Sequence, residues 1–193
     1  MSHEIHQTKA IILRTKSMRE SNRLLVLYTE AFGLVYVSAQ SIREIKSKMR
    51  FHTSRLSLVT VDLVEGRDVW RLTGIHEEVS SMTFADSPWY PMLDRIASVV
   101  FRLCRGEEAN QALWNDIAFL YDRVTSMTDS ESLLDTIEIA IVARILYHVG
   151  YWSGEEDIVT KESSDIMNHL DYVVQHRPSF IKRINQGIEA SQL

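Results

Sequence analysis

Residues 9–40, KAIILRTKSMRESNRLLVLYTEAFGLVYVSAQ, decide the fold of this chain. Three short aliphatic and β-branched runs, Lys9–Lys16, Arg23–Thr29 and Leu34–Gln40, are separated by polar clusters, a pattern typical of β-strands. Gly33 stands between the second and third runs, where a tight hairpin needs a residue that tolerates a positive φ. The stretch therefore predicts three consecutive strands.

Two further strands are predicted on the carboxyl side of this stretch. Ser54–Glu65 alternates polar and apolar residues, Gly66-Arg67-Asp68 turns the chain, and Val69–Glu78 closes the set. Five strands within about 70 residues favour a small closed barrel, because closure removes exposed strand edges. The five-stranded oligonucleotide/oligosaccharide-binding barrel, or OB-fold, is the first prediction, and an SH3-like barrel is the alternative.

The second half of the sequence changes from a strand period to a helical one. Apolar residues recur at steps of three and four, and Pro88 and Pro91 mark a helix start. The expected helices run from Pro88 to Gly106, Leu113 to Val124, Leu134 to Val149, Ser163 to Val174 and Ser179 to Ile188. The sequence therefore predicts an α+β protein with an OB-fold barrel at residues 1–79 and an all-α helical bundle at residues 80–193.

Charge is divided unevenly along the chain. The 193 residues carry a net charge of −5. Residues 1–75 hold twelve Lys and Arg against seven Asp and Glu, which gives +5, and the remainder holds nine against nineteen, which gives −10. Such an asymmetry indicates a polyanion-binding segment in the first half.

The compartment is predicted from what the sequence lacks. No apolar run approaches the roughly 18–20 residues of a membrane span, and the amino terminus is unlike a signal peptide. The single cysteine, Cys104, excludes an internal disulfide and a multi-cysteine zinc site. We therefore expect a cytoplasmic protein, associated with the nucleoid if it binds DNA.

Two basic groups are the candidate nucleic-acid contacts. In an OB-fold, the loop after strand 1 and the faces of strands 2 and 3 line the ligand groove, so both groups could border one groove. Aromatic rings among the cations could stack on bases. The candidate cations are Arg14, Lys16, Arg19, Arg23, Arg43, Lys46, Lys48, Arg50 and Arg55, and the candidate stacking rings are Tyr28, Tyr36 and Phe51.

Patterns of catalysis and of metal binding are missing from the sequence. His169 and His176 are seven residues apart, which is too far for a helical zinc pair, and the glycines form no phosphate-binding loop. Cys104 lies on an apolar helix stripe, as a buried thiol does. We expect no enzymatic activity, no cofactor and no metal.

The chain resembles the RecO family of DNA repair and recombination mediator proteins. The resemblance rests on AIILRTKSMRESNRLLVLYTEAFGLVYVSAQSIREIKSKMR at residues 10–50 and LSLVTVDLVEGRDVWRLTG at residues 56–74, with a weaker match at ARILYHVGY, residues 143–151. It implies an OB-fold followed by a helical domain, binding of single- and double-stranded DNA, strand annealing and help in recombinase loading. The same nine cations would contact the DNA.

The resemblance also implies protein partners: a RecR-type mediator, the acidic C-terminal tail of single-stranded-DNA-binding protein and, indirectly, the strand-exchange recombinase. The cations expected to receive the tail are Arg95, Arg102, Arg105 and Arg144. The sequence departs from the family at the four-cysteine zinc element that many members carry, because no cysteine follows Tyr151.

Two other functions stay open at this point. The acidic helical half and the missing zinc element motivate a module that only bridges repair proteins, without appreciable DNA affinity. A metal-dependent nuclease is the third hypothesis, and it would need carboxylates such as those of residues 155–157 beside the basic segment.

Overall fold

The computed structural model describes residues 4–18, 22–39, 53–126, 130–154 and 156–191. The chain divides into two compact units. Unit 1 comprises Met1–Ala85 and Arg105–Ala109, and unit 2 comprises Asp86–Cys104 and Asn110–Leu193. These ranges differ from the predicted 1–79 and 80–193 in two ways: the first unit extends to Ala85, and it also includes Arg105–Ala109.

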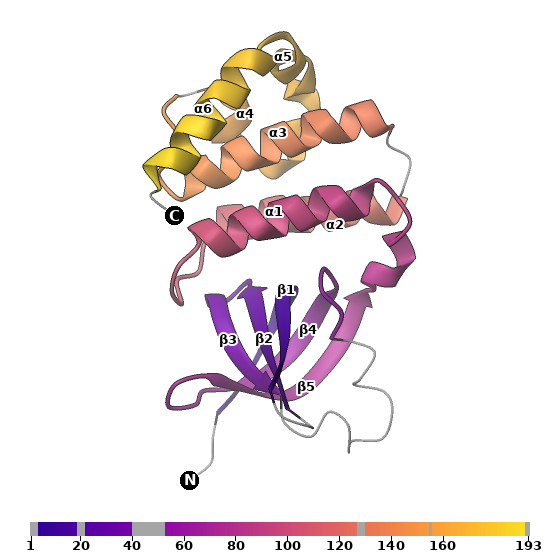
Figure 1. Cartoon of the computed structure of the whole chain (residues 1–193), viewed down its shortest axis with the longest axis vertical. Coiled ribbons are helices and arrows are strands. Elements are labelled where there is room, and N and C mark those ends of the chain that lie inside the picture. The colour runs from indigo at the N-terminus through magenta and orange to yellow at the C-terminus, as the bar shows by residue number, and fades with distance from the viewer. Residues whose placement is uncertain (1–3, 19–21, 40–52, 127–129, 155, 192–193) are drawn as a thin grey trace. The chain divides into compact units, whose positions relative to one another are not determined.

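Unit 1 is a closed five-stranded barrel (Figure 1). The strands are β1 (Ile5–Met18), β2 (Asn22–Thr29), β3 (Gly33–Ala39), β4 (Leu58–Val64) and β5 (Trp70–Val79). Their order is β1-β2-β3-β5-β4, and the long β1 pairs with both β2 and β4. β3 and β5 close the barrel as its one parallel pair among the described strands. This confirms the α+β class and the OB-fold prediction.

Alternation along the strands fills the barrel interior. One apolar core is formed by inward-pointing residues of the strands. It includes Leu25 and Leu27 of β2, Val35 and Val37 of β3, and Val61 of β4. The residues between them, at positions 24, 26 and 28 and at 34, 36 and 38, point to the outer face, because successive side chains of a strand alternate. The outer face is therefore fixed by the register.

The fourth strand begins later than the sequence indicates. Leu56 has a φ of +66°, and its N–H donates to the carbonyl of Ile12 at 2.8 Å. The Ile12 N–H in turn donates to the carbonyl of Ser57 at 3.2 Å, next to a bulge in β1 between Ile12 and Arg14. Residues 54–57 thus form a turn, and β4 starts at Leu58.

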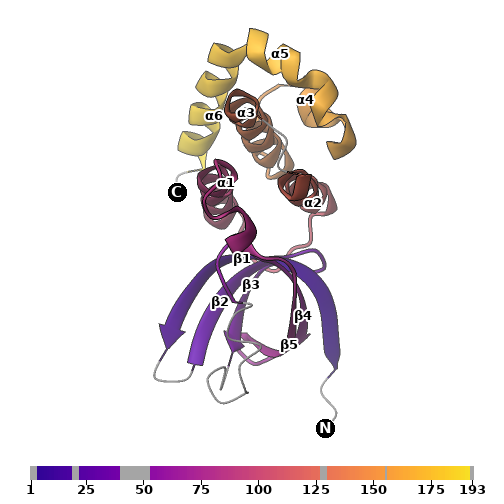
Figure 2. The same cartoon turned by 90° about the vertical axis from the view of Figure 1, so that its right-hand side faces the viewer.

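Unit 2 is a helical bundle around one central helix. Its helices are α1 (Trp89–Leu103), α2 (Gln111–Ser126), α3 (Glu131–His148), α4 (Asp157–Thr160), α5 (Leu170–Gln175) and α6 (Arg177–Ala190). α3 contacts each of the other five, and Figure 2 shows it between them. Its residues 139–146 are all buried, as expected of a helix that is apolar on every side.

The helix predictions are confirmed with two differences. The stretch expected as one helix at 163–174 is a 3₁₀ segment, Ser163–His169, followed by α5. The four-residue α4 and the 3₁₀ turn at Ser81–Phe84 are too short to show a period in sequence. None of the helices in the described ranges combines the length and the apolar character needed to cross a membrane.

Candidate nucleic-acid interface

Strand pairing collects charged and aromatic side chains on the outer face of the barrel. In one row, Arg14 of β1 pairs with Val26 of β2, which pairs with Tyr36 of β3. In the next row, Lys16 pairs with Leu24, Leu24 with Ser38, and Ser38 with Arg71 of β5. Residues directly opposite each other on neighbouring strands share a face. Arg14, Lys16, Tyr36 and Arg71 form what we call the outer row.

The outer row is accessible to a large ligand. Arg14, Lys16 and Arg71 are exposed, and the Tyr36 side chain is 44% exposed. Val26 is only 7% exposed although it faces outward between Arg14 and Tyr36. Neighbouring strands are about 4.8 Å apart, so the path over the curved barrel surface from Lys16 to Arg71 is roughly 14 Å.

The far end of the same face is closed. Tyr28 has the same strand phase as Val26, but its side chain is only 1% exposed, and its strand partners Ile11 and Leu34 are buried too. The prediction that Tyr28 stacks on bases is therefore wrong. An uninterrupted apolar strand, LLVLY, shows no alternation from which this burial could have been recognised. Tyr28 and its two strand partners are therefore closed to a ligand, whereas the outer row is accessible.

Arg23 and Arg55 hold the chain entering β4. Arg23 Nη1 donates to Thr53 Oγ1 at 2.7 Å, and Arg55 Nε donates to the carbonyl of Leu13 at 2.8 Å. Both arginines are half-buried. Each has a structural role at the barrel, and the contact with DNA expected of them stays a prediction.

The remaining candidates of the basic segment lie outside the described residues. They are Arg19, Arg43, Lys46, Lys48, Arg50 and Phe51. Arg71 is a residue that the sequence analysis did not select. Its signal was present in the triplet Trp70-Arg71-Leu72, where two apolar residues flank a cation with strand alternation, but the parallel pairing with β3 that brings it beside Ser38 is visible only in the fold.

The cations expected to receive an acidic tail are not brought together. Arg144 is 2% exposed and ion-paired with the buried Asp116 at 2.8 Å, so its assignment as a surface cation is wrong. Arg95 holds Glu138 through two hydrogen bonds of 2.6 Å, and the bond to Glu138 raises the pKa of the arginine. Arg102 and Arg105 are exposed but belong to different units.

Tyr121 of unit 2 is buried and Cys104 is half-buried. Burial raises the pKa of the Cys104 thiol to about 12 and raises the pKa of the Tyr121 hydroxyl as well. A thiol with a raised pKa holds almost no thiolate at neutral pH and is a poor nucleophile. Cys104 follows α1 directly, at the end of that helix's apolar stripe.

Comparison with known proteins gives a family model and curated relatives that match parts of the chain. Residues 1–77 match the family model described as Recombination protein O N terminal. Two curated relatives, each called DNA repair protein RecO, come from Dehalococcoides mccartyi strains CBDB1 and ATCC BAA-2266 / KCTC 15142 / 195. They are 28% and 26% identical over 138 and 137 residues, which is 71% and 70% of this chain. The chain spans about half the length of these relatives, 54% in each case.

Proposed function

Because this chain belongs to the RecO family, we propose that it acts in DNA repair and homologous recombination, binding DNA on the outer face of its barrel. The observation that carries the proposal is the outer row. Three exposed cations and one exposed aromatic ring follow one another across the outer surface of the barrel, although they come from three different strands, β1, β3 and β5.

The chemistry of the outer row suits a single strand. Cations bind phosphates and release condensed counterions, and this supplies affinity without reading sequence. Tyr36 adds a ring on which an unpaired base can stack, worth about 1–3 kcal/mol per base. A base that stacks on one face of a protein ring keeps its pairing edge in solvent. Strand annealing follows, because the cations reduce repulsion between two phosphate backbones while the bases remain free to pair.

Partners and double-stranded DNA belong to the same proposal. The family membership supports a RecR-type mediator as partner, loading of the strand-exchange recombinase and binding of duplex DNA through backbone contacts. Binding of the acidic C-terminal tail of single-stranded-DNA-binding protein would have to use mainly Arg102 and Arg105, since Arg95 and Arg144 already pair with Glu138 and Asp116.

The test reverses two charges of the outer row in the full chain. Lys16→Glu with Arg71→Glu should weaken binding of a fluorescent single-stranded oligonucleotide at least about tenfold, because charge-assisted contacts to phosphate are lost. The matched control is Arg102→Glu with Lys182→Glu, which makes the same change in net charge with exposed residues of unit 2. Fluorescence anisotropy at low salt measures both.

Two outcomes would contradict the proposal. If the control pair lowers the affinity as much as the outer-row pair, binding depends on net charge and not on this face. If the parent protein captures a RecR-type mediator in a pull-down but leaves the anisotropy of every oligonucleotide unchanged, the chain is a protein-bridging module.

A further inference from the structure

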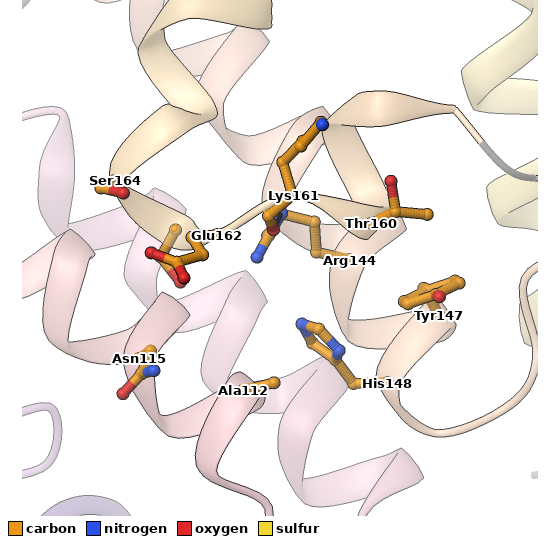
Figure 3. A pocket seen from close by; sticks show the side chains of 10 residues that line it. Ala112, Asn115, Arg144, Tyr147, His148, Thr160, Lys161, Glu162 and Ser164 are labelled. Carbon is orange, nitrogen blue, oxygen red and sulfur yellow. Dashed lines mark hydrogen bonds between the residues drawn. The ribbon is translucent and has the colours of Figure 1, made fainter.

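Unit 2 contains a cavity of about 550 Å³, and none of the residues that line it belongs to the outer row of unit 1. It lies between α2, the carboxyl end of α3 and residues 160–164 (Figure 3). In Figure 3 the Arg144 guanidinium and the His148 ring point into the same space, which Asn115 and Glu162 border. The volume falls within the roughly 300–1,000 Å³ range of small-molecule sites.

Arg144 is fixed in place at the floor of this cavity. Its Nε donates to both carboxylate oxygens of Asp116, at 2.8 and 2.9 Å, and its Nη1 donates to the carbonyls of Ile158 and Lys161, at 2.7 and 2.8 Å. Its side chain is 2% exposed. These bonds join α3 to α2 and to the segment around α4, so the guanidinium is held rigidly.

The remaining nitrogen of that guanidinium, Nη2, is available to a ligand. Arg144 Nη2 has no hydrogen-bond partner in the described part of the chain, and Arg144 lines the cavity. Arg144 Nη2 is not a fully buried atom, so it reaches the solvent that fills the cavity. Two N–H donors on a rigid cation therefore face a space that a ligand can enter.

The charge of Asp116 is compensated inside the protein. Besides Arg144, its oxygens accept from Ser163 Oγ at 2.6 Å and lie 3.0 Å from His148 Nε2. An ionised carboxylate can only accept, so the His148 Nε2 carries a hydrogen in this contact. The negative charge of Asp116 is therefore balanced by Arg144, and Asp116 does not present an unpaired charge to the cavity.

The walls of the cavity add further donors from separate elements. Lys161 and Ser164 come from the segment after α4, and Asn115 comes from α2, where its Oδ1 accepts from Gln111 at 2.9 Å and leaves the amide N–H groups as donors. Glu162 is the one acidic side chain that lines the cavity in the described residues. Tyr147, 39% exposed, adds a ring at the rim.

We propose that this cavity binds the phosphate group of a nucleotide, with Arg144 Nη2 and Lys161 as its two cations. Arginine and lysine both form charge-assisted hydrogen bonds to phosphate oxygens. In Figure 3 the Lys161 ammonium points away from the Arg144 guanidinium, so the flexible lysine side chain has to rotate to reach the same phosphate. The Nε–H of Arg144 is already donated to Asp116, so Nη2 is the nitrogen left for a ligand. Tyr147 is placed to contact the base or sugar attached to the phosphate. The phosphate can belong to a free mononucleotide or to the end of a DNA strand.

The experiment titrates the full chain with deoxyadenosine 5′-monophosphate, deoxyadenosine and inorganic phosphate, followed by ligand-observed NMR. We expect the monophosphate to bind with a dissociation constant on the order of 1 mM or tighter, and deoxyadenosine not to bind. Lys161→Ala should weaken binding about five- to tenfold, because one charge-assisted contact is lost. The carbonyl of Lys161 that accepts from Arg144 is retained in this variant, so the fold is not disturbed.

Lys182→Ala is the matched control, since Lys182 is an exposed lysine of the same unit outside the cavity. Tyr147→Ala should weaken binding of the monophosphate but not of inorganic phosphate. Equal losses of affinity in Lys161→Ala and Lys182→Ala would overturn the proposal. The proposal would also fail if no phosphate probe binds at a concentration about ten times the expected dissociation constant.

The source of the phosphate is separated by a second pair of probes. Oligonucleotides of one sequence with a 5′-phosphate or a 5′-hydroxyl make identical contacts with the barrel. A phosphate-dependent gain in affinity that Lys161→Ala abolishes assigns the cavity to strand ends, and monophosphate binding without such a gain assigns it to free nucleotides. Both results are independent of the outer row, because Lys16 and Arg71 are unchanged.

Discussion

The ion pair of Arg144 with Asp116 shows how one buried residue organises the helical unit. Asp116 lies at 0% exposure on the stripe of α2 that also carries Leu113, Ile117 and Leu120, at spacings of three and four. An acid on an apolar stripe is costly to bury unless it is paired. That misfit was the sequence signal for a buried partner, and only the fold identified Arg144 as the partner.

At this scale we predict that Asp116→Asn lowers the free energy of unfolding by about 3–5 kcal/mol, because it leaves the guanidinium buried without its counter-ion. Glu138→Gln is the control: it breaks the pair with Arg95, whose side chain is 55% exposed, and should cost less than about 1 kcal/mol. Urea denaturation followed by circular dichroism measures both. If both variants lose the same small amount of unfolding free energy, the buried pair stabilises the protein no more than the exposed pair does.

Elements were predicted from their periods, and their ends were set by contacts that periods do not show. The long helices follow from apolar steps of three to four residues, and the strands follow from short aliphatic and β-branched runs bounded by polar clusters. The start of β4 at Leu58 depends on hydrogen bonds between residues 56–57 and Ile12, which is more than 40 residues away. Gly33, chosen from sequence for its positive φ, has a φ of +65° at the start of β3.

Gly33 also lies against the backbone of Glu108, a contact that the hairpin does not require. A Cβ at this position would collide with the backbone carbonyl of Glu108, in the short segment that belongs to the barrel unit. Gly33→Ala should therefore destabilise the protein by about 3 kcal/mol, from left-handed strain and steric overlap together.

Gly106→Ala is the matched substitution, since Gly106 has a φ of +80° and nothing within 4 Å of a Cβ. It should cost only about 1 kcal/mol, the strain alone. Thermal and urea unfolding compare the two variants. A Gly33→Ala protein as stable as Gly106→Ala would mean that the Glu108 segment moves away freely.

For the whole molecule, the division of charge matters more than the total. The net charge of −5 hides the +5 of residues 1–75. Within the described part of that segment, the strand register connects Arg14, Lys16 and Arg71 through neighbouring positions on the outer surface of the barrel. A protein that is acidic overall can bind a polyanion where its cations are concentrated, because screening limits the repulsion from charges beyond about 10 Å.

We therefore predict strongly salt-dependent binding to single-stranded DNA by the full chain. Three neutralised phosphates give a slope of log K against log salt of about −2, and cations of the basic segment would steepen it. Lys16→Ala should reduce the slope by about 0.7. Oligonucleotide titrations at several salt concentrations measure it. A slope near zero would contradict an electrostatic interface.

The candidate site was predicted in part. Arg14, Lys16 and Tyr36 were selected from sequence and lie together on an accessible face, whereas Tyr28 was selected for the same reason and is buried. Arg144 was selected as a surface cation because its charge is visible in sequence, but the carboxylate that neutralises it is 28 residues away and on another helix. Residue type alone does not show which charges are already paired.

The sequence by itself determined the class of fold, the order of strands and helices and the half of the chain that carries positive charge, because periodicity and composition are local properties. Tertiary structure alone decided which cations share a face, which end of the barrel surface is open and which arginine lies in the helical interior. Those features depend on strand register and helix packing between residues that are distant in the chain, and burial is a property of such neighbours rather than of the residue itself.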